Sequence, residues 1–424
     1  MFELRQGHPA KNPTEAAATT ERCSEITIFY ITSSLPFGPG EAFIIPEIQE
    51  LTRQGYRIFL IPMYPRGALL HHEAEKLLER KFIQPLISWT ILKNAVTIIF
   101  RKPIRCLEAF CLLLKSRSLK ILGKNLAVYP KGLWLAALIR KLHPDHIHTH
   151  WAATTASMAM VACTIADVPW SITAHRWDIT ENNLLRQKAC RARFIRAISR
   201  RGANELEDLV TIAGWKAPVI HVGVRLPDLI GPDRRRNDAT LRIITAANLV
   251  PVKGHRYLIE ALRLLTERRE VLHLDLAGDG VLRTELEQIV KEYRLESAVT
   301  FLGCLPHEQL LASLSAGKWD VMVLPSVVDR SGEKEGIPVS LMEAMSRGIP
   351  VISTNTGGIA ELVKDCGILV PPMNPEALAM AIEQLAADPK LREELGKAGR
   401  RRIEERFNLE KCVADLATLF EQAK

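Results

Sequence analysis

Two glutamates, Glu335 and Glu343, lie eight positions apart in the segment EKEGIPVSLMEAMSRGIPVISTNTGG, which runs from Glu333 to Gly358. Between them is a turn that leads into an apolar helix. A carboxylate among buried neighbours needs hydrogen-bond donors, because an unpaired buried charge is costly. The hydroxyl groups of a sugar or a ribose would supply such donors. The spacing fits equally well a solvated loop acid at Glu335 and an ion-paired helix acid at Glu343.

The turn itself predicts a site for anionic oxygens. The stretch DVMVLPS ends a strand, VVDRSGEKEG is a polar loop, and Pro338 suits the first turn of a helix that ends at Gly348. The backbone N–H groups of Gly336 and Ile337 would then lie at an unsatisfied helix N-terminus, which favours negative charge.

Short β-branched runs alternate with helical stretches along the chain, as is typical of parallel sheets with crossover helices. Strands are expected at 26–32, 57–62, 145–150, 170–175, 194–199 and 218–223, and again at 241–247, 271–278, 298–303, 320–326, 349–354 and 367–372. A polar stretch, RLPDLIGPDRRRNDAT, separates the two sets. We therefore predict an α/β chain of two doubly wound, Rossmann-like domains that face a ligand-binding cleft.

The predicted boundaries follow from these patterns. Residues 1–24 form a polar arm expected to be disordered, 25–226 the first domain, 227–240 the linker, and 241–424 the second domain. The last stretch, FNLEKCVADLATLFEQAK, is an amphipathic helix that suits either domain and is assigned to the second. The start has no signal-peptide pattern, and no run reaches the ~18 apolar residues of a membrane span.

The net charge of +8 is unevenly distributed. Residues 81–141 contain twelve Lys and Arg and a single acid, Glu108, for a net charge of +11, so the rest of the chain carries −3. A basic, apolar-rich segment suits an anionic lipid surface or an anionic substrate, and it also fits ordinary solvated helix faces. No nucleic-acid-binding module is recognisable. Eight scattered cysteines without a CxxC pair indicate a reduced, cytosolic chain without structural zinc.

These motifs resemble those of the retaining glycosyltransferases of family GT4, which have the GT-B fold. The segment from Glu335 to Gly358 is similar to the family's E-x7-E signature, and further family blocks follow in order along residues 26 to 424. They are NLVPVKGHRYLIEAL (248–262), AGDGVLRTELE (277–287), FLGCLPHEQL (301–310) and GILVPPMNPEALAMAI (367–382). In the first half, SSLPFGPGEAFIIPEI, HIHTHWA and ITAHRWDIT are similar to the exopolysaccharide subgroup, which includes colanic-acid-type enzymes.

The resemblance implies roles for individual residues. Glu343 would accept hydrogen bonds from the ribose of the donor nucleotide, and Glu335 would contact the donor sugar near its reacting carbon. Lys253 would neutralise the departing diphosphate. His175 would lie beside the donor sugar and stabilise positive charge at the anomeric carbon. The predicted catalytic residues are therefore His175, Glu335 and Lys253.

The predicted donor-binding residues are Asn248, Lys253, Gly336, Ile337, Pro338, Glu343, Gly38 and Gly40. The two glycines in PFGPGEAF let a loop approach phosphate or acceptor closely, although a plain Gly/Pro turn has the same sequence. His146, His148 and His150 alternate as metal ligands can, but the family uses basic residues instead, so no metal and no cofactor is expected.

One position departs from the family pattern. Asn248 replaces an arginine that normally holds the diphosphate together with Lys253, and a charge-assisted hydrogen bond of this kind is worth about 1.5–3 kcal/mol. This departure keeps open an alternative, in which the chain is a non-catalytic GT-B-like binding subunit of a polysaccharide assembly complex. A soluble synthase is a third possibility, but it would not require the basic segment 81–141.

The function implied by the resemblance is that of a hexosyltransferase in bacterial surface polysaccharide synthesis, including lipopolysaccharide. The donor would be a UDP- or GDP-linked sugar, and the acceptor a lipid-linked saccharide. We expect a cytoplasmic protein, peripheral on the inner face of the cell membrane, that contacts anionic lipid through 81–141 and binds no nucleic acid.

Overall fold

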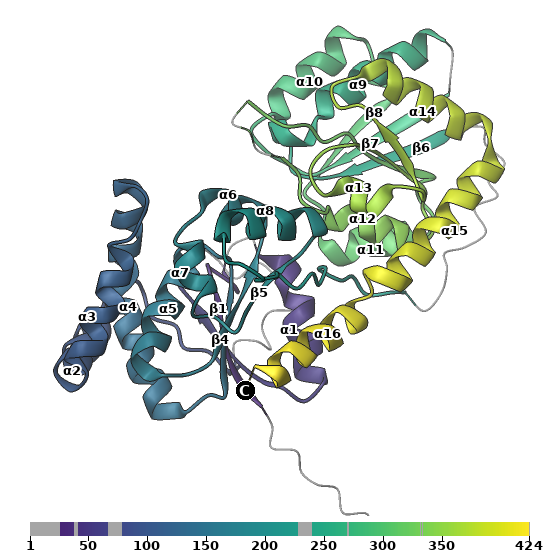
Figure 1. Cartoon of the computed structure of the whole chain (residues 1–424). Coiled ribbons are helices and arrows are strands. Elements are labelled where there is room, and N and C mark those ends of the chain that lie inside the picture. Colours follow the sequence, from purple (N-terminus) through teal and green to yellow (C-terminus); the bar gives the residue numbers. More distant parts are fainter. Residues whose placement is uncertain are drawn as a thin grey trace, which may run out of the picture.

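The computed structural model describes residues 26–37, 41–66, 79–227, 240–268, 271–330, 332 and 334–423. The predicted arm, nearly all of the predicted linker, and both Gly38 and Gly40 lie outside these residues. The described chain forms two α/β domains, each built on one parallel sheet (Figure 1).

The first sheet has the strand order β2-β1-β3-β4-β5, and every strand is parallel to its neighbours. Its strands are β1 (Thr27–Thr32), β2 (Arg57–Pro62), β3 (His146–His150), β4 (Trp170–Ala174) and β5 (Phe194–Ala197). The order reverses between β1 and β3, so the loops that follow these two strands diverge and leave a crevice at the carboxyl edge of the sheet.

The strand expected at 218–223 is not formed, which corrects the prediction. This segment forms only an isolated bridge between Val219 and Ala197. The carbonyl groups of Ile220 and His221 accept hydrogen bonds from the buried guanidinium of Arg196, at 2.9 and 2.8 Å, rather than from a neighbouring strand. A side chain thus replaces the ladder that would extend the pairing.

The second sheet has the order β11-β10-β9-β6-β7-β8, and its pairs are also parallel. Its strands are β6 (Leu241–Ala246), β7 (Leu272–Ala277), β8 (Val299–Gly303), β9 (Val321–Leu324), β10 (Val351–Thr354) and β11 (Ile368–Val370). This is the Rossmann order, with the reversal between β6 and β9. The loops that carry Lys253 and Glu335 follow these two strands.

Helices flank both sheets. Those before the second sheet are η1 (Ala42–Ile44), α1 (Ile45–Arg53), α2 (Trp89–Arg101), α3 (Pro103–Leu113), α4 (Leu119–Leu142), α5 (Thr154–Ala166), α6 (Arg176–Glu181), α7 (Leu185–Ala189) and α8 (Arg200–Val210). The others are η3 (Pro251–Lys253), α9 (His255–Glu267), α10 (Arg283–Glu292), α11 (His307–Ser315), α12 (Val339–Met345), α13 (Ile359–Val363), α14 (Pro375–Ala387), α15 (Pro389–Arg406) and α16 (Leu409–Gln422). Among the described helices, none has the length and apolar character required to span a bilayer.

The terminal helix α16 packs on the first domain, which corrects its assignment to the second (Figure 1). The chain crosses back where the Val224 N–H donates to the Phe407 carbonyl and the Leu409 N–H to the Val224 carbonyl, at 2.9 and 3.1 Å. The apolar face of α16 then joins β1, β2 and α1 in one core, and the Phe420 ring lies 5.9 Å from that of Phe194. The amphipathic pattern of α16 identifies an apolar face but not which sheet it covers.

Replacing Phe420 by alanine should destabilise the first domain by about 3–5 kcal/mol, because it removes a fully buried aromatic ring. Urea unfolding followed by near-ultraviolet circular dichroism would measure the loss. Thr418→Ala, on the exposed side of the same helix, is the control and should change the unfolding free energy by less than about 0.5 kcal/mol. Equal effects of the two substitutions would contradict the packing of α16.

Candidate active site

A cleft of about 1850 Å³ lies between the two domains. One wall comes from the loops after β1, β3 and β4, and the other from those after β6 and β9 and from α11 and α12. The structure brings together in this cleft every described residue of the predicted site, namely His175, Asn248, Lys253, Glu335, Gly336, Ile337, Pro338 and Glu343. Gly38 and Gly40 are outside the described residues, and the role of each residue remains a prediction.

Lys253 and Glu335 form an ion pair in the cleft. Gly254, directly after the lysine, has a φ of 69°, and a Cβ atom there would collide with the carbonyl of Pro325. Gly357 has a φ of 54°, and a Cβ atom there would collide with the carbonyl of Glu335. Both turns therefore require glycine, which lets the loops after β6 and β10 approach the loop after β9 closely. The ion pair is held on a tightly packed set of loops.

Glu343 lies within α12, whose N-cap is Pro338. It is 7% exposed, and its Oε1 is 2.6 Å from Nε2 of His307, which lies at the start of α11. Arg347 donates to the backbone carbonyl of Glu343 at 3.0 Å. Glu343 therefore has a side-chain partner, as expected if it is a paired helix acid rather than a ligand contact. His307 lines the same cleft, so a ligand hydroxyl can reach the carboxylate from the cleft side.

His175 follows β4 and begins α6. Its backbone N–H donates to Asp178 at 2.7 Å, and its ring Nε2 lies 2.5 Å from Nε2 of His150. Burial, with a smaller contribution from the charge of Arg196, lowers the pKa of His175 to about 3. The ring is therefore neutral at physiological pH.

A chain of buried polar groups continues from His150 into the first domain. Tyr30 Oη lies 3.1 Å from Nδ1 of His150 and donates to Glu47 at 2.7 Å, and Glu47 pairs with Arg196 at 2.7 Å. Because the single hydroxyl proton of Tyr30 goes to Glu47, its oxygen accepts from Nδ1–H of His150. Nε2 of His150 then accepts from Nε2–H of His175. The chain thereby fixes the tautomer of His175.

The three alternating histidines of β3 are core residues. His146 and His148 share the hydroxyl of Ser171, at 2.7 and 2.8 Å, and His148 also reaches Thr173 at 3.0 Å. Within the described ranges, no group of three or more His, Cys, Asp or Glu side chains is arranged to hold a metal ion. The expectation that the chain uses no metal stays a prediction.

Asn248 lines the cleft at the end of β6. Two arginines that follow it in the sequence, Arg256 and Arg283, pair with glutamates of α10 and do not line the cleft. Arg347 does line it. Sequence reasoning missed this arginine, because its contribution depends on how α12 is oriented.

The sequence analysis also did not identify several other residues that line the cleft. They are His307, which meets Glu343, and the aromatic residues Phe43, Trp151 and Trp177 of the first-domain wall. The segments that contain them were recognised as similar to family blocks. No spacing rule links these residues to a ligand, so only the folded chain places them together.

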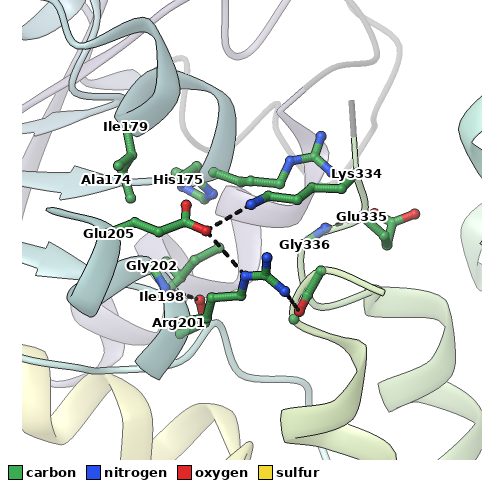
Figure 2. Close-up of a pocket in the computed structure, with 14 residues that line it drawn as sticks. Ala174, His175, Ile179, Ile198, Arg201, Gly202, Glu205, Lys334, Glu335 and Gly336 are labelled. Atoms are coloured by element: carbon green, nitrogen blue, oxygen red, sulfur yellow. Dashed lines mark hydrogen bonds and ion pairs between the residues drawn. The ribbon is translucent and has the colours of Figure 1, made fainter. Parts of the chain in front are cut away.

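The domains meet at one end of the cleft, around the pocket in Figure 2. Lys334 of the second domain pairs with Glu205 of α8 at 2.7 Å, and Arg201 pairs with the same carboxylate at 3.1 Å. Arg201 also donates to the carbonyl of Gly357 at 3.4 Å. His175 and Glu335, from opposite domains, both line this pocket.

Comparison with known proteins gives two family matches. Residues 47–226 match the family described as Glycosyltransferase Family 4, and residues 231–402 match the family described as Glycosyl transferases group 1. The two matches lie on the first and second domains respectively.

Two curated relatives are similar to part of the chain. The putative colanic acid biosynthesis glycosyltransferase WcaL of Escherichia coli is 39% identical over 187 residues, which are 43% of this chain and 45% of the relative. The amylovoran biosynthesis glycosyltransferase AmsK of Erwinia amylovora is 33% identical over 184 residues, with the same coverage of 43% and 45%. The chain thus matches about half of the length of these relatives.

Solved structures match nearly the whole chain. HepE from Anabaena, in complex with UDP, has a TM-score of 0.68 at 19% identity and covers 94% of this chain and 100% of its own. A glycosyltransferase from Rickettsia africae has a TM-score of 0.68 at 18% identity, with 94% and 99% covered. At these identities the likeness establishes the two-domain GT-B fold, which confirms the predicted fold class.

The buried histidines should make the protein less stable in mild acid. Burial lowers the pKa of His146 to about 3 and holds the pKa of His148 and His150 well below the ordinary value. Below pH about 6.5 the unfolded chain takes up protons that the folded chain does not, so stability is complete above this pH and falls as the pH decreases.

Urea unfolding at pH about 7.5 and 5.5 would measure this loss. His146→Gln should reduce it by about 1 kcal/mol, because one depressed group has been removed. His143→Asn changes an exposed histidine and should leave the loss unaltered. A pH dependence that is the same in both variants would rule out this origin.

Proposed function

Because the chain belongs to the GT4-type glycosyltransferases, we propose that it moves a sugar from a nucleoside diphosphate sugar to an acceptor hydroxyl with retention of anomeric configuration. The observation that carries this proposal is the meeting of His175 with Glu335 in one pocket between the domains, beside Lys253 in the adjoining cleft. A cation for the leaving group and a carboxylate for the sugar are thereby within reach of one donor.

In the proposed reaction, the bond between the anomeric carbon and the β-phosphate oxygen breaks, and its electron pair leaves with the diphosphate. The acceptor oxygen forms a bond to the anomeric carbon on the same face. The acceptor proton passes to the departing phosphate oxygen, so the products are a glycoside and a nucleoside diphosphate. No covalent enzyme intermediate is required.

The residues would contribute as follows. Lys253 attracts the negative charge that develops on the diphosphate, which lowers the barrier because this charge is greatest in the transition state. Glu335 accepts hydrogen bonds from the donor sugar, and Glu343 from the ribose. His175, held neutral and in one tautomer, lies where positive charge develops on the sugar without repelling it.

The proposed pathway is bacterial surface polysaccharide synthesis, with a lipid-linked saccharide as acceptor. Support comes from the relatives named for colanic acid and amylovoran biosynthesis, and from an unusual surface on the first domain. Helices α2 and α3 lie at the outer edge of this domain, on the side away from the second domain (Figure 1).

This surface, the α2–α3 surface, is both apolar and basic. Helix α2 buries Ile91, Ala95 and Ile98 against the domain, yet its solvent side is also apolar. Trp89, Phe100 and Ile104 are 81%, 82% and 81% exposed. The other exposed apolar side chains are Ile87, Leu92, Val96, Ile99, Leu107, Leu114 and Leu119, and the exposed basic ones are Lys93, Arg101, Arg105, Lys115, Arg117, Lys120 and Lys124. Exposed apolar side chains together with exposed cations on the same helices suit insertion into an anionic bilayer surface.

The donor site can be tested by thermal stabilisation with UDP, GDP, ADP and CDP in a buffer that contains EDTA. We expect one nucleotide to raise the melting temperature, and Lys253→Ala and Glu343→Ala to abolish the shift, because they remove contacts to phosphate and ribose. Arg263→Ala, on α9 and not among the residues that line the cleft, is the control and should keep the shift.

No shift with any nucleotide would favour the alternative of a non-catalytic binding subunit, in which Asn248 has replaced a required cation. A shift that appears only when divalent metal replaces EDTA would contradict the proposed metal independence.

The membrane contact can be tested by flotation with vesicles that contain phosphatidylglycerol. Trp89→Glu combined with Phe100→Glu should reduce the bound fraction about 10-fold or more at low salt, because it places two charges at the lipid surface. Val281→Glu alters an equally exposed apolar residue of the second domain and should not reduce it. A wild-type protein that fails to float at low salt would contradict the proposal.

A further inference from the structure

Two tryptophans form part of the cleft wall on the first domain. Trp151 directly follows β3, and Trp177 is the second residue of α6. Their ring centroids are 5.4 Å apart with an interplanar angle of 35°. Both residues line the same cleft as Lys253, Glu335 and Glu343.

Trp151 is held in position by several constraints. Its φ of 76° is in the left-handed region, which is costly for a bulky residue. Its backbone N–H donates to the carbonyl of Thr173 at 2.9 Å, and its indole N–H donates to the carboxylate of Glu41 at 2.5 Å. Glu41 is buried and also accepts from the N–H groups of Ser33 and Leu35. The orientation of the indole ring is therefore fixed before any ligand binds.

Trp177 contributes the accessible surface. It is 47% exposed, although it lies on the cleft wall and next to another aromatic ring. Large aromatic side chains with free surface inside a concave site are typical of ligand contacts. An exposed aromatic ring in such a cleft is a stronger indication of ligand binding than a single exposed apolar residue elsewhere, because the cleft is concave and lined by convergent polar groups.

The location of the pair points to the reacting end of a ligand. Trp151 and the loop of Glu41 follow β3 and β1, the strands between which the order of the first sheet reverses, and ligands bind outside such points. The ring centroid of Trp151 lies 4.3 Å from that of His175. A ligand on the tryptophans would therefore lie next to the position proposed for the donor sugar.

We propose that Trp151 and Trp177 form an aromatic platform that binds the sugar ring of the acceptor that receives the transferred sugar. The inference rests on the proposed function, and it names the saccharide subsite within that function. Sugar C–H groups carry partial positive charge and pack against the electron-rich face of an aromatic ring. Among the described residues, all of the proposed donor contacts except His175 lie on the second domain, so most of the first-domain platform is left for the acceptor.

The surroundings favour a saccharide over a lipid chain. The cleft that the two tryptophans line also includes Gln49 and Arg225, polar side chains of a kind that can meet sugar hydroxyls. Broad exposed apolar area is found on the α2–α3 surface instead. The cleft is therefore suited to a saccharide, and the α2–α3 surface to lipid.

Saturation-transfer NMR with methyl glycosides of glucose, galactose, mannose and fucose tests the platform. We expect a signal with at least one glycoside, a decrease of about 5-fold or more in Trp177→Ala, and a smaller decrease in Trp177→Phe, which keeps an aromatic face. Trp89→Ala removes an exposed tryptophan from the α2–α3 surface and should leave the glycoside signal while it weakens vesicle flotation. Trp177→Ala should do the reverse.

Three results would overturn the platform: no glycoside signal from the unaltered chain, an equal signal in Trp177→Ala, or a Trp177→Ala variant that loses flotation instead of glycoside binding. The nucleotide-dependent thermal shift should be retained in Trp177→Ala, and its loss there would assign the platform to the donor. If no nucleotide stabilises any variant while glycoside binding still depends on Trp177, the proposed transferase function fails and the platform stands.

Discussion

The contact between Glu361 and the first domain is one of the interactions that hold the two sheets facing each other. This carboxylate of α13 accepts from the N–H of Arg200, at the start of α8, at 2.8 Å, and it lies 2.7 Å from Nε2 of His221. Burial raises the pKa of Glu361, but the bonds to His221 and Arg200 outweigh burial, so the pKa is lowered and the carboxylate is ionised. An ionised, half-buried acid is stabilised only while both partners stay in place. Together with the Lys334–Glu205 pair, this contact holds the second domain against the first.

The polar interior of the first domain depends on the returning C-terminal helix. The rings of His146 and His148 are each 5.2 Å from that of Phe420, on α16. The opposite end of the same strand delivers His150 to His175 and so to the cleft. At one end of β3, helix α16 shields His146 and His148 from solvent. At the other end, His150 orients His175 in the cleft. The helix that covers His146 and His148 follows the second domain in the sequence, so the core of the first domain is complete only when α16 has packed against it.

The sequence predicted most of the framework, because short β-branched runs report the local environment of a buried parallel strand directly. It failed at 218–223 and α16, where the outcome depends on partners distant in the chain, the Arg196 guanidinium and the β1 face. The same distinction applies to the site. Family motifs identify Lys253, Glu335 and Glu343, but their pairing with each other or with His307 follows from how loops of three different strands pack. Nothing in the spacing indicates how Trp151 is held, because its backbone N–H bonds to Thr173 of a neighbouring strand and its indole N–H to Glu41, 110 positions away.

The pairings seen in the free cleft have a consequence for how a donor would bind. Lys253 pairs with Glu335, and His307 contacts Glu343, so each acid of the motif has a side-chain partner before a ligand arrives. A diphosphate that approaches Lys253 competes with Glu335 for the same cation. As the phosphate takes the lysine, Glu335 loses its partner and becomes available to sugar hydroxyls, and a carboxylate in a partly buried site must then find donors. A nucleoside diphosphate without its sugar leaves Glu335 uncompensated, whereas the intact donor supplies hydroxyl groups at that point. Under the proposed function, this arrangement would favour the complete donor over its product and so promote product release after transfer.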